Sequence, residues 1–248
     1  MFPLTHIATA FAVLKKENTM TVSGSLFPDF ITYLDIGRNM GHELCTDLYY
    51  YTLEHSPEHL DFALGALTHG TSLPGLDTYA DEEYHGEKPG FCFQQGTKIA
   101  QEVNCYCKVP KSMALWKSHN FIEMAFDVIT AQRHPDLQAR AEHHIYATPN
   151  PATGLLSEYL NIAPAQIEEM FSIVPRQFCF NGTDIEEITH KFLLSLERRH
   201  GIKGGNLKDA TKITEKAVAI IKPQYDDFIG EINHNLTADL SKLPKVWD

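Results

Sequence analysis

The sequence predicts an all-α fold, a multi-helix bundle of about eight or more helices. Apolar residues recur at the three- and four-residue spacing of amphipathic helices through most of the chain. Signals for helix starts and breaks follow one another at short intervals, and alternating β-branched runs that would indicate strands are scarce. Because the 248 residues contain no internal repeat and no low-complexity tract, we expect one helical domain over residues 1–248.

The N-terminal part of the chain is expected to hold one helix followed by a connector. An apolar run over residues 4–16 predicts the helix, and Lys15 and Lys16 end its apolar character. Gly24 and Pro28 are residues typical of turns. They predict that residues 19–29 connect the first helix to the next one.

The middle and the end of the chain supply the remaining helices. Ser56 and Pro57 suit the N-cap and first position of a helix that ends at His69. Further helices are expected over residues 39–54, 93–105, 110–129, 134–144, 157–160, 164–173, 184–200, 207–221 and 225–240, with a helical turn at 76–84, a loop at 85–90 and a break at 201–205.

Charge and composition narrow the classes of function. The net charge of −11 argues against an extended nucleic-acid surface and against charge-driven docking to an anionic membrane. We expect no signal peptide, because no basic segment precedes an apolar run at the N-terminus, and no transmembrane segment, because no apolar stretch approaches 18 residues. Five cysteines without the paired spacing of a zinc ribbon favour reduced thiols in a cytoplasmic protein.

The most informative motif is His119-Asn-Phe-Ile-Glu123, which lies in a predicted helix. Residues four apart are neighbours on one helix face, so the imidazole and the carboxylate are expected to lie side by side. The apolar residues around them predict that this face is buried. A buried carboxylate needs a partner, and a metal ion or a simple hydrogen bond to His119 would each provide one.

Other histidines and acids could join this pair. Seven of the 13 histidines fall in the stretch from His6 to His119, counting both ends. His69 ends an apolar run, and Asp77, Asp81 and His85 follow at intervals of four residues, which would place all three on one helix face. The candidate metal ligands are His6, Asp29, His42, His69, His85, His119 and Glu123, with Asp77 and Asp81 as candidate catalytic acids or bases.

This mixed set of imidazoles and carboxylates predicts a hydrolytic metal site. Such ligands suit zinc most readily, with iron or manganese as alternatives, and leave positions open for water and substrate. Two or three ions could clamp a phosphoryl group and lower the pKa of a water molecule that attacks phosphorus. We find no serine or cysteine with a convincing base partner and no glycine-rich phosphate loop.

The order of the motifs resembles the helical superfamily of zinc-dependent phospholipases C and three-zinc single-strand nucleases. The resemblance covers about residues 1–130, and we assign no role to the helices of residues 131–248. The matching motifs are His6, Gly24-Ser-Leu-Phe-Pro28-Asp29, His42, Leu64-Gly-Ala-Leu-Thr-His69, the stretch from Asp77 to His85, and His119-Asn-Phe-Ile-Glu123.

The resemblance implies a metal-dependent, phospholipase C-like hydrolase of a small phosphoester, with a metal-bound hydroxide as the nucleophile. Two departures imply fewer than three ions. Leu73 stands where the superfamily usually has the aspartate of a His-x-x-x-Asp motif, so Asp77 or Asp81 would replace it. Secreted members also use a processed N-terminal residue as a ligand, which a chain without a signal peptide would lack.

Two other functions remain open on the sequence alone. Three Glu-x-x-His pairs, Glu82–His85, Glu187–His190 and Glu231–His234, are typical of di-iron carboxylate oxygenases. A non-catalytic helical module with structural histidines is the other alternative, and it predicts no bound metal. The sequence leaves the substrate and the oligomeric state open.

Overall fold

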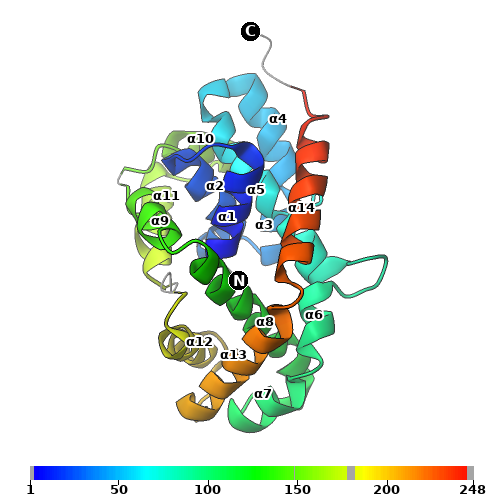
Figure 1. Ribbon diagram of the computed structural model, residues 1–248. Helices are drawn as coiled ribbons and strands as arrows, with labels where there is room; N and C mark the ends of the chain where they lie inside the picture. The colour runs from blue at the N-terminus through cyan, green and yellow to red at the C-terminus, as the bar shows by residue number, and fades with distance from the viewer. Residues whose placement is uncertain (1–2, 148, 178–181, 245–248) are drawn as a thin grey trace. The chain divides into compact units, whose positions relative to one another are not determined.

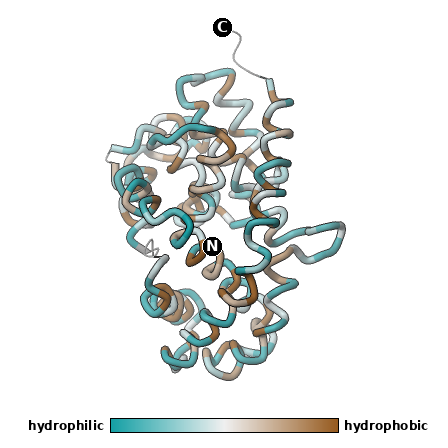
Figure 2. Tube along the Cα trace, viewed as in Figure 1, coloured by the Kyte–Doolittle hydropathy of each residue, from teal (hydrophilic) through white to brown (hydrophobic). Residues whose placement is uncertain are grey.

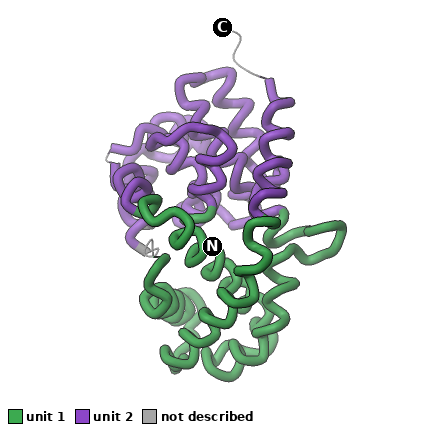
Figure 3. Tube along the Cα trace, viewed as in Figure 1, with its two compact units in different colours: residues 1–5, 79–138, 178–228 green, residues 6–78, 139–177, 229–248 purple. Residues whose placement is uncertain are grey.

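The computed structural model describes residues 3–147, 149–177 and 182–244, and in these ranges it contains helices and no β-strand (Figure 1). The prediction of an all-α, multi-helix fold is confirmed. The chain divides into two compact units, which Figure 3 colours separately. Unit 1 comprises residues 1–5, 79–138 and 178–228, and unit 2 comprises residues 6–78, 139–177 and 229–248. Each unit therefore draws on residues from both sides of residue 130.

Four of the helical segments, α1 (Pro3–Leu14), η3 (Thr78–Glu82), α9 (Leu137–Ile145) and α14 (Tyr225–Leu240), contribute residues to both units. Unit 2 also contains α2 (Thr19–Phe30), η1 (Ile31–Leu34), α3 (Arg38–Glu43), α4 (Cys45–His55), η2 (Pro57–His59), α5 (Leu60–His69), α10 (Thr153–Leu160), α11 (Pro164–Ile173) and η4 (Val174–Gln177), and most of α9 (Leu137–Ile145). Unit 1 contains α6 (Phe91–Gly96), α7 (Ala100–Tyr106), α8 (Lys111–Arg133), α12 (Ile185–His200) and α13 (Leu207–Ile221), and most of the π-helical turn η3 (Thr78–Glu82).

The prediction that residues 19–29 form a connector is wrong, because these residues form α2. Asn18 caps the helix, since its side-chain oxygen accepts a hydrogen bond from the backbone N–H of Thr21 at 2.9 Å. Gly24 lies where α2 crosses α5, and a Cβ atom there would lie 2.0 Å from the carbonyl oxygen of Phe62. The glycine therefore permits close helix packing and does not mark a turn.

The α2–α5 crossing uses glycine on both helices. A Cβ atom on Gly65 of α5 would lie 2.6 Å from the carbonyl oxygen of Thr21 on α2. Phe27 of α2 and Phe62 of α5 are buried, with ring centroids 5.3 Å apart. The two backbones thus approach closely in unit 2, and this contact fixes where the C-terminal ends of both helices lie.

Several long helices expected from the sequence are interrupted. Residues 39–54 divide into α3 and α4 at Leu44, and residues 93–105 divide into α6 and α7. Pro57 begins a 3₁₀ turn, and Ser56 makes no side-chain cap. The apolar periodicity continues across such breaks, which explains why it does not reveal them.

Unit 1 is built around α8, against which α6, α7 and α13 pack. Phe91, Phe126 and Phe228 form an aromatic cluster, and the ring centroids of Phe91 and Phe228 are 4.4 Å apart. Asp127 of α8 accepts hydrogen bonds from the backbone N–H groups of Leu4 and Thr5, at 3.2 and 2.9 Å. A buried carboxylate thus satisfies donors in the first turn of α1.

Hydrophobic and hydrophilic residues are interspersed along the helices (Figure 2). None of the helices in the described part of the chain is long and apolar enough to cross a membrane.

Candidate metal centre

Five of the predicted site residues come together in unit 2. His6 lies on α1, Asp29 near the end of α2, His42 on α3, His69 at the last position of α5, and Asp77 just before η3. The ligand atoms of His6, His69 and Asp77 lie within 4.8 Å of one another, and so do those of Asp29, His42 and His69. We call these five residues the His–Asp cluster. All three histidines and Asp77 are buried.

Backbone carbonyls orient two of the histidines. Nδ1 of His42 lies 2.8 Å from the carbonyl oxygen of Arg38, and Nδ1 of His69 lies 2.7 Å from that of Ser25. A carbonyl oxygen can only accept, so each Nδ1 carries the hydrogen and donates it. In the neutral rings the lone pairs are therefore on the Nε2 atoms, an arrangement that proteins use to present histidine to a metal.

The two Nε2 atoms face each other at 3.2 Å. Two lone pairs at this distance repel, and neither ring can relieve the repulsion by changing tautomer without losing its carbonyl partner. A proton on one Nε2 atom, or a metal ion bound by both, must therefore offset this repulsion. This requirement is the main structural reason to regard the cluster as a metal centre.

Asp77 completes the arrangement. Its Oδ2 lies 3.0 Å from Nε2 of His42 and 3.4 Å from Nε2 of His69, and its Oδ1 lies 3.3 Å from Nε2 of His6. Two ligand atoms that bind a tetrahedral zinc ion at about 2.1 Å are separated by about 3.4 Å. The observed spacings thus need little adjustment for an ion. Asp29 lies farther out, with 4.0 Å between its Oδ1 and Nε2 of His42.

The charges in the cluster depend strongly on one another. Burial, aided by nearby His69, lowers the pKa of His6 to about 4, so this ring is neutral at pH 7. Burial opposes the charged forms of His69 and Asp77, but their mutual attraction is stronger. It raises the pKa of His69 and holds the pKa of Asp77 well below its usual range. In the absence of metal, the extra proton that the paired Nε2 atoms require therefore belongs on His69.

A second group lies in unit 1 and contains Asp81, His119 and Glu123, whose ligand atoms also lie within 4.8 Å of one another. All three side chains are buried. Nε2 of His119 is 3.7 Å from Oε1 of Glu123, as the four-residue spacing on α8 predicts. The side-chain amide of Asn120 donates a hydrogen bond to Oε2 of Glu123 at 2.7 Å, and Phe93 stacks on the His119 ring.

The structure separates Asp77 from Asp81, which the sequence offered as alternatives. Asp77 belongs to the His–Asp cluster of unit 2, and Asp81 belongs to the group in unit 1. His85 is exposed and stacks on Tyr84, with 3.9 Å between the ring centroids. Among the residues described, it belongs to none of the groups that could hold a metal.

Sequence reasoning missed three contributors. Arg38 lies four residues before His42, and its Nη2 atom is 2.9 Å from Oδ2 of Asp77. The i, i+4 spacing was visible, but a lone arginine on a helix usually faces solvent. The carbonyl of Ser25 is a backbone group, so side-chain identity gives no signal for it. Asn120 stands inside the His119 motif, but its amide is not among the usual zinc ligands.

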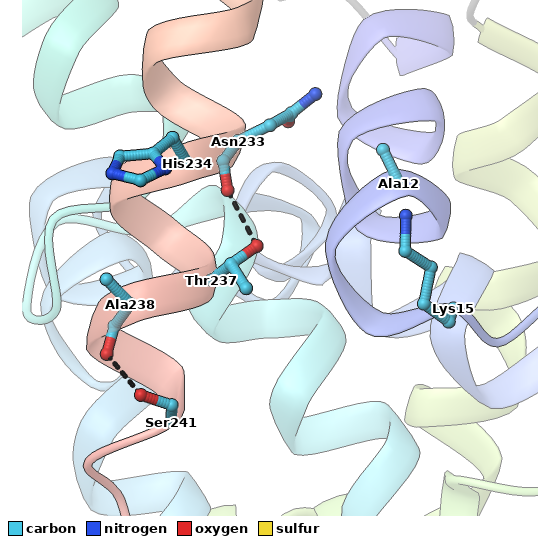
Figure 4. Close-up of a pocket in the computed structure, with 7 residues that line it drawn as sticks. All are labelled: Ala12, Lys15, Asn233, His234, Thr237, Ala238 and Ser241. Carbon is cyan, nitrogen blue, oxygen red and sulfur yellow. Dashed lines mark hydrogen bonds between the residues drawn. The ribbon is translucent and has the colours of Figure 1, made fainter.

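Unit 2 also has an open groove, lined by Ala12, Lys15, Asn233, His234, Thr237, Ala238 and Ser241 (Figure 4). The hydroxyl of Thr237 donates to the carbonyl of Asn233 within α14, and the hydroxyl of Ser241, just after the helix, donates to the carbonyl of Ala238, both at 2.7 Å. His234 points away from α1 in this view. The groove includes no residue of the His–Asp cluster, and its polar side chains do not converge on one point.

Comparison with protein families, with curated proteins and with solved structures gives no match for this chain.

Proposed function

We propose that this protein is a metal-dependent hydrolase that cleaves a phosphoester, with a site like that of a phospholipase C. One observation carries the proposal. The Nε2 atoms of His42 and His69 face each other beside Asp77, and backbone carbonyls hold both rings in this orientation. The order of the motifs along the chain suggests the phosphoester class.

We assign one ion to each unit. Nδ1 of His69 is committed to Ser25, so its Nε2 can serve only one ion, although it belongs to both overlapping ligand groups of unit 2. His119 and Glu123 would hold the other ion, with the carboxylate of Asp81 within 4.8 Å of their ligand atoms. Zinc suits these nitrogen and oxygen donors, and it would polarise a phosphoryl oxygen and lower the pKa of a coordinated water.

The two aspartates take different roles in this proposal. A general base works best when its pKa is near the working pH, and the histidines hold the pKa of Asp77 far below that range. Asp77 is therefore assigned as a metal ligand. Asp81 remains the candidate for a base that orients the attacking water.

Metal analysis and hydrolysis of bis(4-nitrophenyl) phosphate test the proposal together. Zinc should co-purify at about one ion per unit, and activity should disappear with a chelator and return with zinc. H69A should lose the ion of unit 2 and, with it, the activity. H55A is the control, because His55 is on α4 of the same unit with its side chain 46% exposed and outside the metal-binding groups. Full activity in the metal-free protein would refute the proposal.

The same analysis separates the other two functions. Bound iron with an oxo-bridge absorption band would favour the di-iron oxygenase, and absence of bound metal would favour the non-catalytic module. Within the described ranges, the three Glu-x-x-His pairs contribute no residue to the candidate metal groups, which favours the hydrolase.

A further inference from the structure

Arg38 links the surface of unit 2 to the buried His–Asp cluster. Its side chain is 42% exposed, while that of Asp77, with which it pairs, is only 4% exposed. The Nη2 atom of Arg38 lies 2.9 Å from Oδ2 of Asp77. One end of this contact is therefore accessible to a solute, and the other lies among the candidate metal ligands.

Arg38 contributes to the cluster through its backbone as well as through its side chain. Arg38 is the first residue of α3, and its backbone carbonyl accepts the Nδ1 hydrogen of His42 at 2.8 Å. Replacing the side chain leaves that carbonyl in place. The orientation of His42 and the function of the guanidinium can therefore be tested separately.

Charge accounting indicates what Arg38 could bind. Asp29 and Asp77 supply two negative charges, Arg38 supplies one positive charge, and metal-ligating histidines are neutral. With a divalent ion bound, the cluster and Arg38 together carry one positive charge, and this ion also competes with Arg38 for Asp77. A metal-loaded cluster would favour an anion close to the guanidinium.

We propose that Arg38 binds the phosphoryl group of the substrate, with its guanidinium exchanging Asp77 for a non-bridging phosphoryl oxygen when a metal ion occupies the cluster. This inference rests on the proposed function and deepens it, because it assigns the residue that recognises the anion. The planar guanidinium matches two phosphoryl oxygens at once, whereas a lysine would offer only a point charge.

Calorimetric titration of the zinc-loaded protein with inorganic phosphate tests the proposal without relying on activity. The variants are R38M and R38K, and R140M is the matched control. Arg140 belongs to the same unit, is 41% exposed, and pairs with Glu17 at 2.7 Å. R38M should weaken phosphate binding about tenfold or more, R38K should recover part of the loss, and R140M should bind as the parent does. Zinc content should stay unchanged in all three.

Three results would overturn the proposal. The first is phosphate affinity in R38M within twofold of the parent. The second is loss of zinc from R38M and R38K, which would make Arg38 a support for Asp77. The third is acetate binding as tight as phosphate and equally dependent on Arg38, which would assign a carboxylate ligand. Parent protein that binds phosphate through Arg38 but hydrolyses no phosphoester would refute the proposed function and leave this inference standing.

Discussion

Replacing Gly24 by alanine tests how the α2–α5 crossing builds the His–Asp cluster. The new Cβ atom would lie 2.0 Å from the carbonyl oxygen of Phe62, and real Cβ atoms essentially never come nearer than 3.0 Å. The atoms closest to this Cβ position belong to the backbone of Phe62 on α5, so no side-chain rotation can relieve the overlap. The helices must therefore separate by about 1 Å at this point.

Two opposing terms set the change in stability. Overpacking of this kind costs about 1–3 kcal/mol, and alanine in place of glycine inside a helix returns about 0.5–1 kcal/mol. We expect G24A to lower the free energy of unfolding by about 1–2 kcal/mol. The effect on the cluster should be larger, because His69 of α5 donates to Ser25 of α2 across this crossing at 2.7 Å.

A separation of about 1 Å would lengthen that hydrogen bond past its useful range, and loss of such an outer partner typically costs 10- to 100-fold in metal affinity. Urea unfolding and zinc titration against a competing chelator measure the two effects. G230A is the control, because Gly230 lies inside α14 in the same unit with open space around its Cβ position. It should gain about 0.5–1 kcal/mol and bind zinc normally.

The outcome that would refute this reasoning is a G24A protein that binds zinc as tightly as the parent. Equal stability gains in G24A and G230A would also contradict it, since the crossing would then tolerate a methyl group.

Three further predictions follow from named residues. His69 has a raised pKa and must lose its proton to bind a metal, so zinc affinity should rise with pH through and above its ordinary pKa of 6.5. Calorimetry near pH 7 in buffers of different ionisation enthalpy should detect the released proton, and a buffer-independent enthalpy would count against it. E123Q should lose the ion proposed for unit 1, whereas E102Q, which removes an exposed ion pair with Lys216, should keep it in metal analysis. Burial raises the pKa of Cys107 to about 12, so a thiol reagent should label exposed Cys105 first in peptide mapping; equal rates would show that Cys107 is accessible.

Local sequence signals explain why most helices could be predicted. α13 and α14 have the expected bounds of 207–221 and 225–240, because each combines a clear apolar period with a defined start. α2 could not be predicted in the same way. Gly24 and Pro28 are typical turn residues, and only the neighbouring helix α5 reveals why a glycine is needed there.

The sequence predicts which residues are candidate ligands, but it does not predict which of them lie together. His69, His119 and Glu123 could be selected because they interrupt apolar runs, where a polar side chain needs a partner. Their division between two units depends on contacts between distant segments. The carbonyl of Ser25 and the guanidinium of Arg38 complete the cluster through geometry that side-chain spacing does not specify.

The most direct test of the metal centre is an anomalous difference map at the zinc edge from crystals of the zinc-loaded protein. We predict a peak within about 2.1 Å of the Nε2 atoms of both His42 and His69. Zinc peaks confined to exposed histidines such as His55 or His85, with these two rings still facing each other at 3.2 Å, would contradict it.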